Sequence, residues 1–306
     1  MTSAEISTAE LWNHTVNRLR EHFATKNIPE KLKEPSYNQA LAEHICSLMY
    51  HLCYKDMKLY DQAITDFIDY SVEFLKLQLE LEKTGSYLFS SYKEAHDNVY
   101  QNKEVMEKRY LNGLLLSQAL WINHHTILNY FVQEFCRQAT ETGNVMEVPV
   151  GSGIFISEFT IRNTKWTAEA YDISPSSVAF AKKILQLKIP NNTITLIQKN
   201  IFDLSSENKY DAIICGELLE HLEDPEQLLR KLKSMLHPNG RLFLTTAIWA
   251  AAIDHIYLFK SAQEVRTMLQ RYFKIEKELV LTVFSGKSPE EEKTPINYAC
   301  ILTPKL

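Results

Sequence analysis

Hydrophobic residues in the first 140 positions recur every three or four residues, which is the spacing of helices with one apolar face. In the stretch 60–83 the apolar positions are Ile64, Phe67, Ile68, Val72, Leu75 and Leu79. The same spacing predicts further helices over 41–57, 105–120 and 127–136. Glycine is nearly absent here, and Gly85 in K-T-G-S marks an expected helix end. The first 140 residues are therefore predicted to be all helical.

After residue 143 the pattern changes to short β-rich runs that alternate with helical stretches. The predicted strands are 145–150, 167–173, 194–199, 210–215 and 241–246, and the clearest helices between them are 176–187 and 225–236. Such alternation predicts a parallel sheet covered by helices on both faces. Asp224 followed by Pro225 reads as a helix start, and H-P-N-G at 237–240 is expected to turn that helix into the next strand.

The end of the chain departs from this alternation. Residues 273–284 and 297–302 are two strand-like runs joined by a charged loop, which predicts an antiparallel pair at one edge of the sheet. The sequence thus predicts two domains, a helical one over 1–140 and an α/β one over 141–306. The latter is expected to hold a Rossmann-like, mostly parallel sheet of seven strands.

Composition narrows the function classes. The net charge is −5 and the pI about 6.1, so the overall charge balance gives no electrostatic footprint for nucleic acid, although a local basic patch is still compatible with it. The most apolar run, 242–253, is too short to span a bilayer. Five scattered cysteines without a C-x-x-C pair, and a start that lacks signal-peptide features, favour reduced thiols in the cytoplasm. A homodimer is a possible assembly.

The stretch V-M-E-V-P-V-G-S-G at 145–153 is the main candidate for ligand binding. Glycines after a strand let the backbone approach a ligand, and a helix that starts there favours an anionic group. A P-loop would need a lysine, but neither lysine nor arginine occurs over 146–160. A dinucleotide site would want a third glycine, and that position holds Ile156. S-adenosylmethionine is the third candidate, because it has a carboxylate for the loop and the helix start, an ammonium group for an acid such as Glu147, and a ribose diol.

Asp172 lies nineteen residues after Gly153, at the end of the second predicted strand. A carboxylate in that place can accept both hydroxyl protons of a ribose. The spacing alone does not separate a dinucleotide from S-adenosylmethionine.

Four pieces of the sequence together resemble the class I S-adenosylmethionine-dependent methyltransferases, especially the branch of ubiquinone-biosynthesis and small-molecule enzymes. They are V-M-E-V-P-V-G-S-G, A-Y-D-I-S-P-S-S-V-A-F-A-K-K, Y-D-A-I-I-C-G-E-L-L-E-H-L-E-D-P and L-H-P-N-G-R-L-F-L-T-T, spread over 144–250. The resemblance is specific for fold and cofactor and weak for substrate. The helical half looks like the lid that many members add in front of this core.

The resemblance implies a role for each matching position. Glu147 corresponds to the acid near the methionine ammonium, and Gly151 and Gly153 to the cofactor loop. Asp172 corresponds to the ribose acid, with Ile173 beside the adenine. The positions beside the sulfonium and the incoming acceptor are Cys215, Gly216 and Glu217.

Two positions depart from the family pattern. Pro149 replaces the first glycine of the usual loop, and proline has no N–H to offer a ligand. Asn200, followed by Ile201, stands where many members have an aspartate for the adenine amine. An amide oxygen can still accept that hydrogen bond, and Asp203 is the alternative if the register slips. Pro149, Asn200 and Ile201 are therefore kept among the cofactor-binding residues.

Candidate chemical groups follow the fourth and fifth predicted strands. Glu217 and His221 lie in G-E-L-L-E-H-L, and Asp254 and His255 lie in A-I-D-H-I-Y-L-F. Methyl transfer is an in-line displacement that depends on positioning, and it needs a base only where the acceptor keeps its proton. His255, His221 and Glu217 are the catalytic candidates. The alternative is that these histidines are structural or bonded to the backbone.

The helical half contributes further candidates in K-R-Y-L-N-G-L-L-L-S-Q-A-L-W-I-N-H-H. Tyr110, Trp121 and His124, together with Asp254, are predicted to contact the acceptor, with ordinary helix packing as the alternative. His124 and His125 are adjacent and do not share a helix face. No metal site is therefore expected.

The sequence predicts an enzyme that transfers a methyl group from S-adenosylmethionine to oxygen, nitrogen or carbon of a small molecule, with secondary metabolism as a natural setting. A protein or nucleic-acid methyltransferase is a second interpretation. A non-catalytic binding module, supported by Pro149 and Asn200 alone, is a third. A dinucleotide oxidoreductase is the most distant alternative.

Overall fold

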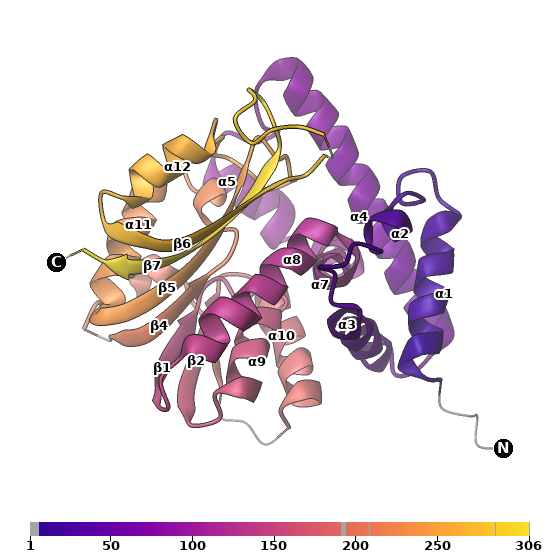
Figure 1. The fold of residues 1–306 in the computed structure, drawn as a ribbon, viewed down its shortest axis with the longest axis horizontal. Helices are drawn as coiled ribbons and strands as arrows, with labels where there is room; N and C mark the ends of the chain where they lie inside the picture. The colour runs from indigo at the N-terminus through magenta and orange to yellow at the C-terminus, as the bar shows by residue number, and fades with distance from the viewer. Residues whose placement is uncertain (1–5, 191–193, 208, 285, 306) are drawn as a thin grey trace.

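The computed structural model describes residues 6–190, 194–207, 209–284 and 286–305, and these form a sheet of seven strands (Figure 1). The strand order is β3-β2-β1-β4-β5-β7-β6, and β7 alone runs antiparallel, to both of its neighbours. The strands are β1 Gly143–Glu147, β2 Trp166–Asp172, β3 Thr195–Gln198, β4 Tyr210–Cys215, β5 Leu236–Ile248, β6 Phe273–Thr282 and β7 Ile296–Pro304. The predicted seven-stranded, mostly parallel sheet and its antiparallel edge pair are confirmed.

Successive side chains of each strand enter two different hydrophobic cores, because a strand alternates its faces with every residue. Val145 and Phe243 pack on the face covered by α9 (Ile154–Arg162) and α10 (Pro175–Lys188). Met146, Leu242 and Leu244 pack on the face covered by α11 (Pro225–Met235) and α12 (Ala262–Leu269). Figure 1 shows α11 and α12 on the opposite side of the sheet from α9 and α10.

The helix α11 begins as predicted, since the Asp224 side chain accepts a hydrogen bond from the Gln227 N–H and Pro225 is its first residue. The predicted turn at 237–240 is wrong. Strand β5 already begins at Leu236 and contains these residues, and the register against β4 shifts between Tyr210 and Ala212.

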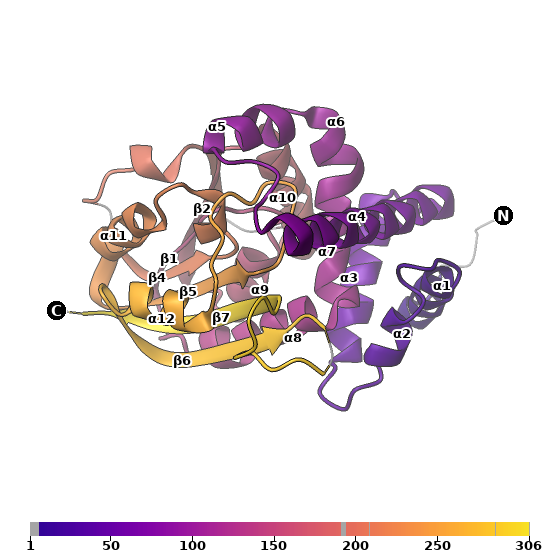
Figure 2. The same ribbon diagram turned by 90° about the horizontal axis from the view of Figure 1, so that it is seen from above.

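From Thr8 to Gln138 all the regular secondary structure is helical, as predicted, and the helices stack at one end of the sheet (Figures 1 and 2). They are α1 Thr8–Arg20, α2 Ile28–Lys31, α3 Gln39–Leu52, α4 Met57–Thr84, α5 Tyr92–Ala95, α6 Lys103–Val105, α7 Leu111–Leu120 and α8 Ile122–Tyr130. Two π-helical turns, His96–Tyr100 and Met106–Tyr110, interrupt the segment between α5 and α7. A third, Phe131–Phe135, extends α8 and is followed by the 3-10 turn Cys136–Gln138.

Helix α4 ends at Gly85, whose φ of +73° is the left-handed conformation expected of a glycine after a helix. The predicted helix over 41–57 is too long. Helix α3 stops at Leu52 because Tyr54 and Lys55 both have positive φ, and Asp56 then caps α4 through the Lys58 N–H.

A single hydrophobic core joins the helical part to the sheet, with members from α3 and α4 as well as from β1, β4 and β5. The domain boundary at residue 140 therefore stays a prediction. No helix in the described ranges is both long and apolar enough to cross a bilayer.

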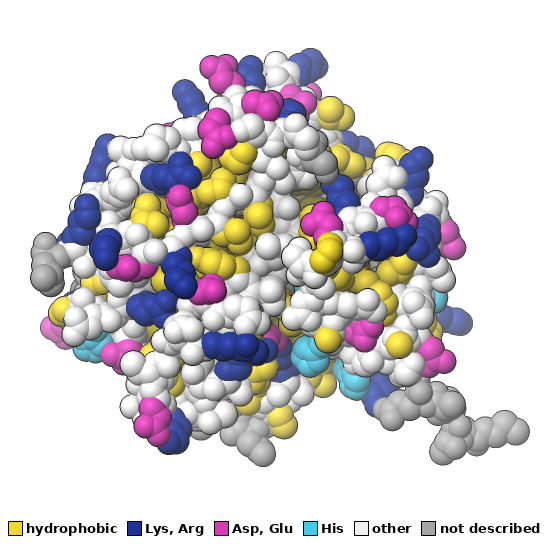
Figure 3. Space-filling view, viewed as in Figure 1, with side chains coloured by type: hydrophobic (Ala, Val, Ile, Leu, Met, Phe, Trp, Pro, Cys, Tyr) yellow, Lys and Arg dark blue, Asp and Glu magenta, His cyan; other side chains and the backbone are white. Residues whose placement is uncertain are grey.

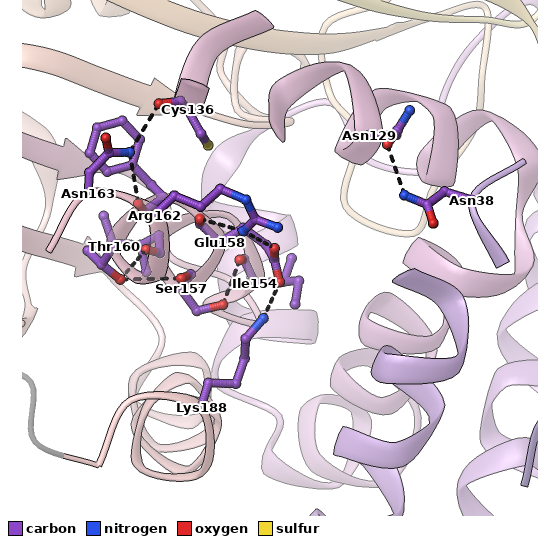
Figure 4. Close-up of polar contacts among 12 residues, drawn as sticks. Asn38, Asn129, Cys136, Ile154, Ser157, Glu158, Thr160, Arg162, Asn163 and Lys188 are labelled. Atoms are coloured by element: carbon purple, nitrogen blue, oxygen red, sulfur yellow. Dashed lines mark hydrogen bonds and ion pairs between the residues drawn. The ribbon is translucent and has the colours of Figure 1, made fainter. Parts of the chain in front are cut away.

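A buried ion pair fastens α9 to α10 beneath this core (Figure 4). Glu158 of α9 binds Lys188 of α10 through one carboxylate oxygen and Arg162 through the other, and the Glu158 and Lys188 side chains are almost fully buried. Burial alone would raise the pKa of Glu158, but the two cations outweigh it and hold that pKa below its usual value.

Candidate functional site

The strand order reverses between β1 and β4, so the loops after these two strands diverge and leave a crevice at the carboxyl edge of the sheet. A cavity of about 150 Å³, the switch-point cavity, lies there. A second cavity, the side cavity, shares with it the lining residues Tyr92, Pro149, Asp172, Ile173, Leu218 and Leu222. The two cavities therefore adjoin over the ends of β1, β2 and β4 and are together called the cleft.

The glycine loop forms one wall of this cleft. Gly151 lines it with a φ of +49°, a conformation that favours glycine. Gly153 is not among the residues that line it, and its predicted contact with the cofactor stays a prediction. With φ +77°, Gly153 precedes α9, and a Cβ there would lie 2.9 Å from the Cβ of Ala181 on α10. Gly153 is thus required for close packing of α9 on α10.

Pro149 belongs to the site, since it lines both cavities, and the peptide bond before it is cis. The neighbouring amides remain in the sheet. Val148 N–H donates to the Ile214 carbonyl at 2.9 Å, and Val150 N–H donates to the Tyr171 carbonyl at 2.8 Å. The proline therefore leaves the strand connections on both sides of the loop intact.

Glu147 ends β1 at the floor of the switch-point cavity and is 2 % exposed. One carboxylate oxygen accepts the Ile156 N–H of α9 at 3.1 Å, and the other has no partner among the described residues. Burial raises the pKa of this carboxyl well above its ordinary value. A cationic ligand group in the cavity would offset that burial and restore the charged form.

Asp172 ends β2 and lines both cavities. Its oxygens accept the Gly151 N–H at 3.0 Å and the Ser174 N–H at 2.8 Å, which fixes the carboxylate against the glycine loop. Burial raises the pKa of Asp172 to about 6, although these backbone N–H groups oppose the shift.

Affinity for a ligand that donates hydroxyl protons to Asp172 is expected to fall with pH, because a protonated carboxyl accepts such bonds less well. S-adenosylhomocysteine should bind about tenfold more weakly at pH 5 than at pH 7.5, since one proton with a pKa near 6 competes with binding. Titration calorimetry across this range measures the effect. Asp172→Asn should bind weakly at every pH, and a pH dependence that persists in this variant would show that another group is responsible.

Asn200 and Ile201 line the side cavity beside Ile173. The Asn200 side-chain oxygen accepts the Phe202 N–H at 3.0 Å, so its orientation is fixed by its own backbone turn. Asp203 is exposed and is not among the residues that line the cavity. Of the two alternatives from the sequence, the structure places Asn200 at the cavity.

The end of β4 separates three residues that were predicted to act together. Gly216 and Glu217 line the switch-point cavity, but Cys215 is fully buried in the core beneath it. The predicted place of Cys215 beside the sulfonium stays a prediction, and burial raises the pKa of its thiol. Glu217 has a φ of +48°, unusual for this residue, and its N–H donates to the Thr245 carbonyl at 3.1 Å.

A polar network joins the helical part to the loop after β5. Tyr100 and Tyr110, which line the cavity from the π-helical turns, both donate to one carboxylate oxygen of Asp254, at 3.1 and 2.9 Å. His221 also lines the cavity, and its Nδ1 lies 3.0 Å from the Asp254 carbonyl. Asp254 is fully buried and is not among the residues that line either cavity, and its predicted contact with the acceptor stays a prediction.

His255 and Trp121 lie elsewhere than predicted. His255 is buried outside the cleft, and its Nδ1 donates to the Ala250 carbonyl at 2.8 Å, so the backbone-bonded alternative is the one found. Burial lowers the pKa of His255 to about 4. Trp121 lines a different cavity on the far side of His124, whereas His124 and Tyr110 line the switch-point cavity as predicted.

Three buried residues could hold a metal ion, which the sequence did not predict. Glu220, His221 and His255 each offer one ligand atom, and all three atoms lie within 4.8 Å of one another. In both histidines Nδ1 faces a backbone carbonyl, which can only accept, so Nδ1 carries a proton and Nε2 is the ring nitrogen left to face a metal ion. Metal-binding histidines usually show this arrangement.

If this group binds a divalent ion, adding Zn²⁺ to chelator-treated protein should raise its melting temperature. The expected rise is about 5 °C at an ion concentration 100 times the Kd. His255→Asn should abolish the rise, because it removes one ligand. An unchanged melting temperature in the wild type, or the same rise in the variant, would contradict metal binding at this place.

Several known proteins are similar to this chain in sequence. A family model described as "Methyltransferase domain" matches residues 121–290, more than half of the chain, and the chain belongs to this family. The ubiquinone biosynthesis O-methyltransferase of Schizosaccharomyces pombe is 28 % identical over 132 residues, which are 42 % of this chain and 47 % of the relative. That of Xanthomonas axonopodis pv. citri is 31 % identical over 104 residues, 33 % of this chain and 42 % of the relative. The chain thus spans less than half of either relative.

Among solved structures, that of mitomycin 7-O-methyltransferase matches with a TM-score of 0.53 at 11 % identity. The match covers 76 % of this chain and 68 % of the other. At this identity the likeness shows a shared fold.

Several cavity residues were not foreseen from the sequence. They are Tyr92, Tyr100, Leu114, Gln118, Phe155 and Thr245. The abundance of tyrosine in the helical half, ten of the fifteen, was the available signal for the first two. It did not say which tyrosines face inward, because the π-helical turns change the helical phase just there.

Proposed function

We propose that the chain binds S-adenosylmethionine in the cleft and transfers its methyl group to a small-molecule acceptor. One observation carries the proposal: two buried carboxylates, Glu147 and Asp172, flank Gly151 in a crevice where strand order reverses. S-adenosylmethionine offers a cation and a ribose diol, which are the partners that such a pair lacks. Membership in the methyltransferase family supports the same assignment.

The residues present fit this cofactor. The free oxygen of Glu147 would accept from the ammonium group, and Asp172 would accept from the ribose hydroxyls. Gly151 leaves the backbone open to the ligand in the switch-point cavity. The adenine would be surrounded by four residues that line the side cavity, namely Pro149, Ile173, Asn200 and Ile201. When bound, the cofactor supplies an activated methyl group on a sulfonium.

Gly216 and Glu217 would adjoin the acceptor, because they lie at the end of β4 in the same cavity as Glu147. Glu217 and His221 can each position the acceptor, whereas His255 is held away from the cavity by its bond to Ala250. Both relatives named above are O-methyltransferases, and so is a malonyl-[acyl-carrier protein] O-methyltransferase of Priestia megaterium, 25 % identical over 154 residues. Oxygen is therefore the favoured acceptor atom.

The test is formation of S-adenosylhomocysteine from S-adenosylmethionine in the presence of a panel of hydroxylated small molecules. Product that depends on one acceptor supports the proposal. Methylation of added peptides alone would favour a protein methyltransferase. Tight cofactor binding without turnover across both panels would favour a non-catalytic module.

Three sequence predictions remain proposals beside this function. A cytoplasmic location is supported by the five cysteines, all of which are free thiols. A homodimer is testable by light scattering of the purified chain. A role in secondary metabolism depends on the identity of the acceptor.

A further inference from the structure

A cavity of about 160 Å³, here called the outer cavity, opens between the helical part and the ends of β6 and β7. Its lining is largely apolar and comes from three parts of the chain. They are Phe74 and Leu75 of α4, Trp121 and Ile122 at the junction of α7 and α8, and Phe284 after β6. Hydrophobic side chains gather in the middle of this face, where Figure 1 shows these elements meeting (Figure 3). Nothing in the cofactor assignment uses this space.

The wall of the outer cavity is aromatic and ordered. The Trp121 ring stacks on Tyr70 with centroids 5.3 Å apart and contacts Phe74 at the same separation. Flat faces of this kind favour flat apolar ligands, because stacking adds to the burial of apolar area.

His124 lines both the outer cavity and the switch-point cavity, so its ring is shared by their walls. Its Nδ1 lies 2.9 Å from the Ser117 hydroxyl, and that hydroxyl already donates its single proton to the Leu114 carbonyl at 2.8 Å. Nδ1 must therefore donate to Ser117, which leaves Nε2 unprotonated. Nε2 has no hydrogen bond to the part of the chain that is described.

The surroundings of His124 suit a proton acceptor. Burial lowers its pKa, and Glu217 across the switch-point cavity partly opposes that shift. The ring is thus neutral at pH 7 and can accept a proton, and the Glu217 carboxylate would stabilise the cation formed.

We propose that the outer cavity holds the flat, apolar body of the acceptor and that His124 is the general base for its hydroxyl group. This rests on the proposed function. The acceptor oxygen bonds to the methyl carbon as the carbon–sulfur bond breaks. S-adenosylhomocysteine leaves with that electron pair, and the hydroxyl proton passes to Nε2 of His124 and then to solvent.

The binding half of the proposal is tested with 2-naphthol, a flat apolar compound with one hydroxyl group, titrated into protein saturated with S-adenosylhomocysteine. Ala24→Trp should weaken 2-naphthol binding at least tenfold, because Ala24 is a half-buried lining residue of the outer cavity alone. Its matched control is Leu79→Trp, since Leu79 is 67 % exposed on α4 and lines no cavity named here. Equal binding by Ala24→Trp and Leu79→Trp overturns the assignment of the outer cavity.

The chemical half is tested by methylation of 2-naphthol. His124→Gln should lower kcat about 100-fold or more, while the Kd of S-adenosylhomocysteine stays unchanged. Added imidazole should restore part of the kcat of His124→Ala, which a structural role would not allow. Unchanged kcat in His124→Gln overturns the role of His124, and no methylation of 2-naphthol by cofactor-bound wild type overturns the acceptor class. Failure of S-adenosylhomocysteine to bind the wild type is a separate result, which refutes the proposed function itself.

Discussion

Replacing Asp172 with alanine is expected to weaken the binding of S-adenosylhomocysteine about 100-fold. The ribose would lose two hydrogen bonds to a carboxylate, each with a net value of about 1.5 kcal/mol or more, and 2.7 kcal/mol corresponds roughly to a factor of 100. The variant also loses the bonds that hold the Gly151 and Ser174 amides, which loosens the loop. Titration calorimetry of both proteins at pH 7.5 measures the difference.

The matched control is Asp203→Ala. This aspartate lies three positions after Asn200, but it is exposed and outside the cleft, so its removal should leave the affinity within about twofold of the wild type. If Asp203→Ala weakens binding as strongly as Asp172→Ala, then Asp203 contacts the ligand and the choice of Asn200 over Asp203 is wrong. Unchanged affinity in Asp172→Ala would show that Asp172 does not bind the ribose.

Replacing Lys188 with methionine is expected to lower the free energy of unfolding by about 3 kcal/mol, because it leaves the buried Glu158 carboxylate short of a partner. The cost should fall at the lower end of the usual range of about 3–5 kcal/mol, since Arg162 still binds the other oxygen. The midpoint of urea unfolding, followed by circular dichroism, gives the comparison.

Two further variants test whether burial of the Glu158–Lys188 ion pair causes the loss of stability in Lys188→Met. Lys165→Met removes an ion pair to Glu141 on the surface, where both side chains are mostly exposed, and should cost about 0–1 kcal/mol. Glu158→Leu combined with Lys188→Met should recover most of the stability, because no unpaired charge then remains inside. Equal losses in Lys165→Met and Lys188→Met would contradict the argument.

The cofactor side of the cleft could be predicted from the sequence because its signals are local. The strand, the glycine turn and the helix start occupy consecutive residues, and Asp172 ends the next strand at a fixed distance. Glu147, Gly151 and Asp172 therefore come together wherever this strand–helix–strand unit folds. Even the loop proline did not disturb the prediction, since the amides on either side of it stay in the sheet.

The acceptor side could not be predicted in the same way, because packing between distant elements decides where its side chains point. Trp121 has extended backbone angles that interrupt the helix between α7 and α8. Its side chain lines the outer cavity. Cys215 and Gly216 are neighbours, yet the end of β4 sends one to the core and leaves the other at the cavity. His255 was expected at the mouth, but a backbone carbonyl holds it below the surface of the cleft.

The central claim is that the cleft at the reversal of strand order binds S-adenosylmethionine. The most direct measurement is a calorimetric titration of wild-type protein with S-adenosylhomocysteine, with NADH titrated in parallel. We predict one S-adenosylhomocysteine per chain with micromolar or tighter affinity, and no heat from NADH. Binding of NADH alone, or of neither compound, would contradict the claim.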